Sequence, residues 1–157
     1  MTHATVARII LIKLARAVVW HGVADRTDPD HAAVLRKLDL AIDEELAALP
    51  RAKRESALRH ATRNTEIIMA PHIAGNTHCA AFGLALVYVL QELTNQGLYE
   101  PAGAFADALE NGLMSEDGTI AERHNIDLAS AASVKLGRKI IAALNSLGYF
   151  PALELAA

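Results

Sequence analysis

The segment from Thr5 to His21 constrains the fold of this chain more than any other part of the sequence. Its charged side chains are Arg8, Lys13 and Arg16. At 100° per residue these three fall within an arc of about 140°, which leaves about 220° of the helix surface apolar. A helix on the surface of a two-layered protein buries a narrower stripe than this. The segment is therefore expected either to lie between other helices or to contact a second subunit.

The spacing of apolar residues predicts helices along the rest of the chain. Asp28-Pro29 is a typical helix start, with a carboxylate cap followed by proline. The residues after it recur every three or four positions, which indicates an amphipathic helix: His31, Val34, Leu35, Leu38, Ile42, Leu46 and Leu49. Pro50 separates this helix from a third helix over Arg51 to Met69, which Pro71 is expected to end.

A fourth helix is predicted at about residues 77–95, before Gly97. It has no charged residue from Ala80 to Leu90, so it is expected to be buried at the centre of a bundle. Glu100-Pro101 begins a short helix that ends near Gly112. The last helix is expected to run to Leu147, where Gly148 is a suitable stop.

No segment has the alternating apolar pattern of a strand. A chain of 157 residues suits one domain, which buries about 70% of its unfolded surface without a disulfide or a metal. The sequence therefore predicts an all-α protein, with a single domain over residues 1–157. It is expected to be a bundle of five or six helices with a buried central helix at about 77–95.

The sequence also indicates a soluble, cytoplasmic protein. The longest uncharged apolar run, residues 79–90, has twelve residues, whereas a membrane span needs about 20. Charged residues interrupt the apolar start of the chain, which does not resemble a signal peptide. A single cysteine forms no internal disulfide, which fits a reducing compartment. No cofactor is indicated.

Two histidines and the only cysteine of the chain lie together in MAPHIAGNTHC, residues 69–79. Zinc takes about four ligands, and His pairs on a helix are usually three or four residues apart. His72 and His78 are six apart across a turn that contains glycine, so a metal site at these histidines, completed by His31 or His124, stays a hypothesis. The simpler interpretation is a helix–turn–helix connection in which Thr77 caps the next helix.

Cys79 suggests a second hypothesis for the same stretch. A thiol in the first turn of a helix lies near the positive end of the helix dipole, which lowers its pKa and increases its reactivity. No motif places an acid or a base beside it, however. The interpretation as a small, packed apolar residue is therefore preferred.

Basic residues cluster in RAKRESALRHATR, residues 51–63. Against Glu55, they leave a net charge of +4 over thirteen residues, which is enough for several phosphate contacts: Arg51, Lys53, Arg54, Arg59 and Arg63. The segment has no aromatic side chain for base stacking. Nucleic-acid binding is therefore an alternative function, whereas a solvated helix face is the usual meaning of such a run.

Motifs of known enzyme classes are missing from the sequence. It has no GxGxxG, GxxxxGK[ST] or GxSxG, and no Glu-x-x-His pair of a carboxylate-bridged metal bundle. No segment is specific enough to name a family. The sequence thus favours a non-enzymatic protein over an activity that uses a metal at His72 and His78 or the thiol of Cys79.

The amount of apolar surface favours a function through protein contacts. Hydrophobic residues make up 52% of the chain, which is more than a small bundle is expected to enclose. We therefore expect a structural, adaptor or regulatory module that forms a homodimer or a larger assembly, in addition to contacts with an unknown protein partner. The expected interface residues lie on the first helix: Val6, Ile9, Ile10, Ile12 and Trp20. The alternative is a monomer in which this helix is central.

Overall fold

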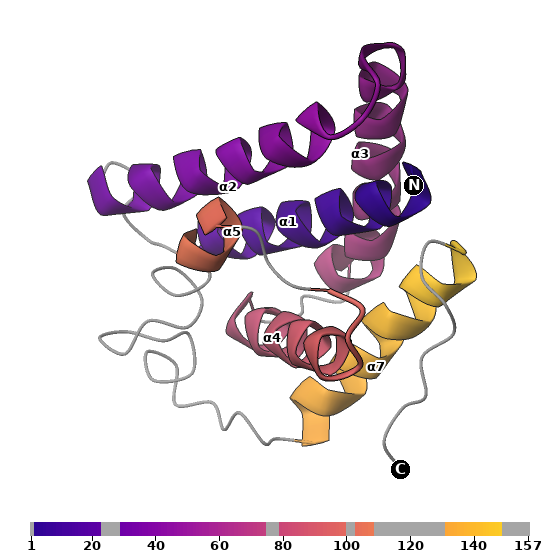
Figure 1. Cartoon of the computed structure of the whole chain (residues 1–157). Helices are drawn as coiled ribbons and strands as arrows, with labels where there is room; N and C mark the ends of the chain where they lie inside the picture. Colours follow the sequence, from indigo (N-terminus) through magenta and orange to yellow (C-terminus); the bar gives the residue numbers. More distant parts are fainter. Residues whose placement is uncertain (1, 23–28, 75–78, 100–102, 109–130, 149–157) are drawn as a thin grey trace.

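The computed structural model describes residues 2–22, 29–74, 79–99, 103–108 and 131–148. All regular secondary structure in these ranges is α-helical, which confirms the predicted all-α bundle (Figure 1). The helices are α1 (Thr2–Gly22), α2 (Pro29–Ala47), α3 (Arg51–Ala74), α4 (Cys79–Asn95), α5 (Gly103–Ala108) and α7 (Ala131–Ser146).

Several helix ends lie where the sequence predicts them. α2 begins at Pro29 and α3 begins directly after Pro50. α4 ends in a Schellman motif, because the Gly97 amide donates to the Thr94 carbonyl at 3.0 Å and the Leu98 amide donates to the Leu93 carbonyl at 2.9 Å. Gly97 has a φ of 68°, a left-handed conformation that glycine adopts without a steric cost.

Pro71 does not end the third helix, so that prediction was wrong. α3 continues through Pro71 to Ala74. A proline in the last turn lacks the amide that would donate to the carbonyl of Ile67, but the helix can proceed beyond it. Ile67 and Pro71 are both exposed, so water can reach this carbonyl.

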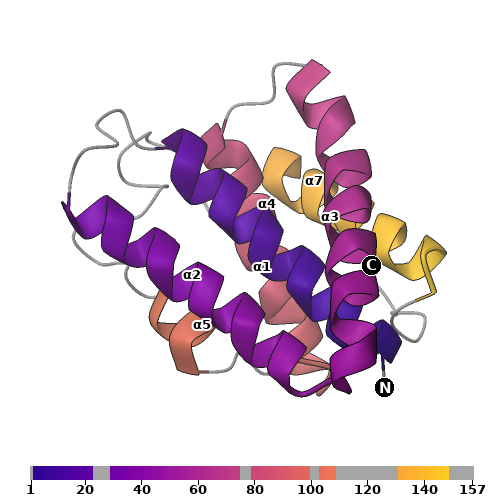
Figure 2. The ribbon, with the colours of Figure 1, turned by 90° about the horizontal axis from the view of Figure 1, so that it is seen from above.

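α1 lies at the centre of the molecule. It packs against α2, α3 and α4, while α7 covers the other side of α4 and α5 packs against α2 (Figures 1 and 2). The described side chains from Phe82 to Leu93 of α4 are mostly buried, in agreement with the predicted buried helix. The hydrophobic core thus extends along α1 and continues between α4 and α7.

The buried position of α1 corrects the predicted interface. Val6, Ile9, Ile10 and Ile12 are at most 2% exposed within the single chain. Three neighbouring helices cover the wide apolar arc, which is the arrangement expected for a helix that is apolar on most sides. These four side chains therefore belong to the core and are not available to a second subunit.

α4 and α7 approach each other closely at Gly137. A Cβ atom at this position would overlap with Cδ1 of Tyr88 and would lie 3.1 Å from the carbonyl oxygen of Ala85. The missing side chain of Gly137 therefore makes room for the tyrosine ring. None of the described helices combines the length and apolar character that crossing a membrane requires.

Candidate interaction surface

A groove between α1 and α3 lies beside Trp20, the remaining residue of the predicted interface. Trp20 is 40% exposed, and the cavity in the groove has a volume of about 270 Å³. The residues from α1 recur at the spacing of one helix face, and those from α3 do the same. Together they line the groove: Lys13, Arg16, Ala17 and Trp20 on α1, with Thr62, Thr65 and Glu66 on α3.

The groove has charges of both signs. The Nε of Arg16 donates to Oδ1 of Asp39 on α2 at 2.7 Å. Lys13 and Glu66 take part in none of the salt bridges between the described residues. Lys13 and Glu66 can therefore pair with charges of a partner, although Glu66 also lies three residues from Arg63 on α3.

A separate polar cluster joins α1 to α2. The Nε of Arg8 donates to Oε2 of Glu45 at 3.0 Å. Tyr99 is buried close to this ion pair, and burial raises the pKa of its hydroxyl above the ordinary value, with a further increase from the Glu45 carboxylate and a smaller decrease from Arg8. The buried position indicates a structural role for this cluster.

The basic residues of α3 differ in their surroundings. Arg54 caps α2, because its Nε donates to the Leu49 carbonyl at 3.1 Å and its Nη2 donates to the Ala47 carbonyl at 3.3 Å. Arg51, Lys53, Arg59 and Arg63 are exposed. At 100° per residue, Arg51, Arg59 and Arg63 fall within an arc of about 120°, and Lys53 lies about 80° beyond Arg63.

Carboxylates also balance the charge on the outer face of α3. A hollow of about 460 Å³ is lined by Glu55, Leu58, Arg59, Thr62, Arg63 and Glu66. Its two arginines face two glutamates at helical spacings that favour ion pairs. The four charges that line this hollow cancel, so the excess positive charge of the segment comes from Arg51, Lys53 and Arg54. Nucleic-acid binding by α3 stays a prediction.

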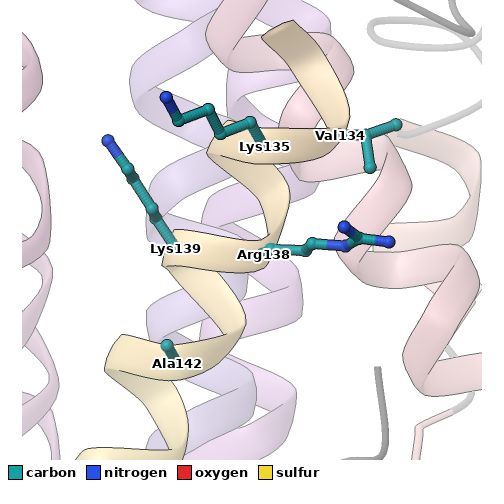
Figure 3. A pocket seen from close by; sticks show the side chains of 5 residues that line it. All are labelled: Val134, Lys135, Arg138, Lys139 and Ala142. Carbon is teal, nitrogen blue, oxygen red and sulfur yellow. The ribbon is translucent and has the colours of Figure 1, made fainter. Parts of the chain in front are cut away.

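A third hollow, on α7, was missed in the sequence analysis. Its volume is about 490 Å³, and its lining residues all belong to this helix: Val134, Lys135, Arg138, Lys139 and Ala142 (Figure 3). Lys135 and Lys139 project on one side of the helix and Arg138 on the other. The sequence has a signal for this site, because three of the four Lys and Arg residues in 71–157 lie between positions 135 and 139.

The metal and thiol hypotheses fall on residues that the structure describes only in part. His78 lies outside the described residues, and the side chains of His72 and Cys79 are not described, although α3 and α4 include their backbones. Among the described residues, no group of three His, Cys, Asp or Glu side chains is arranged to hold a metal ion. Both hypotheses stay predictions.

Comparisons of the chain with protein-family models, with curated proteins and with solved structures found no match. The surface features described above are therefore the basis for the proposed function.

Proposed function

We propose that the protein is a non-enzymatic module that acts through protein contacts and forms a homodimer through the groove between α1 and α3. The exposure of Trp20 is the observation that supports this most directly. It is 40% exposed, although its helix is otherwise the core of the molecule. Tryptophan is the residue most enriched among those that dominate binding energy at protein interfaces.

The shape of the groove suits a second helix. Its walls are two rows of side chains at helical spacing, one on α1 and one on α3. α1 has 21 residues and so a length of about 30 Å, which allows an extended contact. In such a contact, the indole of Trp20 would lie between α1 and α3 of the partner and lose its contact with water.

The charges of the groove favour a second copy of this chain as the partner. In a twofold-symmetric dimer, each contact between two different residues occurs twice. Lys13 of one protomer would then pair with Glu66 of its partner, and the reverse pair would form as well. Unlike charges on facing surfaces also fix the relative orientation of the two copies.

Replacement of Trp20 tests the proposal. Sedimentation velocity from 1 to 100 μM should show a monomer–dimer equilibrium for the wild-type chain. Trp20→Ala should raise the dissociation constant of the dimer about 30-fold, since interface residues of this kind contribute about 2 kcal/mol or more. Leu40→Ala is the matched control, because Leu40 is also a large exposed side chain but lies on α2.

Two outcomes of these sedimentation experiments would contradict the proposal. A wild-type chain that stays monomeric up to 100 μM would contradict the proposed homodimer. Equal effects of Trp20→Ala and Leu40→Ala would show that the groove is not the contact surface.

Reversal of the two groove charges provides an independent test. Lys13→Glu and Glu66→Lys should each weaken the dimer, because each places like charges opposite one another in both symmetric contacts. The double variant restores two pairs of unlike charges and should recover most of the wild-type affinity. A double variant that dissociates more readily than both single variants would argue against the proposed pairing.

A further inference from the structure

α7 has an unusual concentration of positive charge. Residues 71–157 contain four Lys and Arg against nine Asp and Glu, yet three of these four cations lie on α7. α7 itself includes no carboxylate. Two exposed lysines and a half-buried arginine thus form a positive surface in the acidic half of the chain.

The positions of these three cations do not stabilise α7. Lys135 and Lys139 are four residues apart, at a spacing where like charges repel and destabilise a helix. Cations stabilise the last turn of a helix and carboxylates the first, but α7 has neither. Helix stability therefore does not explain the three cations.

The described part of the chain also supplies no counter-ion for the two lysines. Lys135 and Lys139 are exposed, and the salt bridges between described residues involve Arg8, Arg16 and Lys37 as the cations. Arg138 is half-buried and makes an interaction within the chain. The ammonium groups of the two lysines are therefore the hydrogen-bond donors that a ligand can contact. Arg138 adds its positive charge on the other side of the helix (Figure 3).

We propose that this α7 hollow binds a soluble oligophosphate anion, of the class that includes inorganic tripolyphosphate and nucleoside triphosphates. Ammonium groups bind phosphate oxygens through charge-assisted hydrogen bonds, which are stronger than bonds between neutral groups. The hollow is open to solvent, because a single helix lines it, and its volume of about 490 Å³ can accommodate an anion of this size. Val134 and Ala142 add apolar surface at the two ends of the hollow, against which an organic group of the ligand can pack.

Calorimetric titration with inorganic tripolyphosphate at low ionic strength tests the site. Wild-type protein should bind one anion per chain. The double variant Lys135→Ala/Lys139→Ala should bind at least tenfold more weakly, because both ammonium donors are lost. Both positions are exposed and alanine favours helix, so circular dichroism should show that the variant remains folded.

The matched control is Arg51→Ala/Lys53→Ala. It removes the same two charges from exposed positions on α3 and should leave the affinity unchanged within about twofold if binding is local to α7. An equal loss in both variants would overturn the proposal, since the anion would then respond only to the net charge. Absence of binding to the wild-type chain at millimolar tripolyphosphate would overturn it as well.

A second arm distinguishes a soluble anion from a lipid headgroup. Vesicles of phosphatidylcholine with one fifth phosphatidylserine, and vesicles of phosphatidylcholine alone, are sedimented with the protein. The proposal requires that tripolyphosphate binds and that the anionic vesicles capture no more protein than the neutral ones. Capture by anionic vesicles that depends on Lys135 and Lys139, without tripolyphosphate binding, would assign the site to a membrane surface and contradict the soluble ligand.

Discussion

The hydroxyl of Tyr99 is buried and forms no hydrogen bond with a described residue. Its ring contacts that of Phe105, with the ring centroids 6.1 Å apart. The desolvation of a hydroxyl without a partner has a cost in stability, whereas the ring contributes apolar burial. The aromatic ring, and not the hydroxyl, is therefore the stabilising part of this side chain.

Tyr99→Phe should change how stability depends on pH. Burial raises the pKa of Tyr99 above its ordinary value of 10.0, so the folded state keeps a proton that the unfolded state loses. The protonated hydroxyl therefore contributes fully to the free energy of unfolding below about pH 10. Above that pH, the free energy of unfolding falls by about 1.4 kcal/mol per pH unit. Urea denaturation at pH 7, 9 and 10.5 should show a smaller fall for the variant. Parallel curves for the two proteins would contradict the assignment.

Arg54 shows why residue type alone did not reveal the role of the basic segment. From the sequence it was one of five similar cations, but in the structure its guanidinium donates to two carbonyls at the end of α2. Its role depends on the angle between α2 and α3, which spacing along one helix does not determine.

Arg54→Ala should lower the free energy of unfolding by about 1–2 kcal/mol, because two carbonyls at a helix end lose a charged donor. Arg51→Ala is the control, since Arg51 is exposed at the start of the same helix and should change the stability little. Chemical denaturation measures both. A similar cost for the two variants would indicate that the cap contributes nothing measurable.

Helix boundaries were the most predictable part of the fold. Pro29, Pro50 and Gly97 mark the ends of helices through restrictions on the local backbone, which act whatever the neighbours are. Pro71 was misinterpreted because the same restriction is tolerated in a last turn whose carbonyls are exposed. The pairing of α4 with α7 was not predictable, since amphipathicity shows which face is buried but not against which helix.

Gly137→Ala tests the contact between α4 and α7. Alanine is favoured in a helix by about 1 kcal/mol over glycine, but the overlap with Tyr88 is expected to cost up to about 3 kcal/mol. The net result should be a destabilisation of about 1–2 kcal/mol in thermal or chemical denaturation. Gly103→Ala is the control, because no atom lies within 4 Å of a Cβ at that position. A Gly137→Ala protein more stable than wild type would show that Tyr88 moves aside without cost.

The abundance of apolar residues predicted self-association, but the structure assigns most of α1 to the core. Composition counts apolar side chains without regard to how many helices surround them. α1 has three neighbouring helices, so one chain conceals the wide apolar arc by itself. What the sequence could not reveal was that Trp20 would differ from Ile9 and Ile10 in its exposure, since that depends on where α3 crosses α1.

If the protein dimerises, its thermal stability should increase with concentration, because the folded dimer is favoured by mass action. The midpoint of unfolding should rise between 1 and 100 μM for the wild-type chain and should rise less for Trp20→Ala. Trp20 is the only tryptophan, so its fluorescence should also shift to shorter wavelength as the wild-type dimer forms. A midpoint independent of concentration would argue against association.

The central position of α1 also has a consequence for biosynthesis. α1 leaves the ribosome before the helices that cover it, because α2, α3 and α4 are complete only at Asn95. At about 5–20 residues per second, the synthesis of the intervening chain takes roughly 4 to 15 seconds. During that time the nascent chain exposes an apolar helix that its neighbouring helices do not yet cover completely. Exposed apolar segments of this kind are typical binding sites for chaperones at the ribosome.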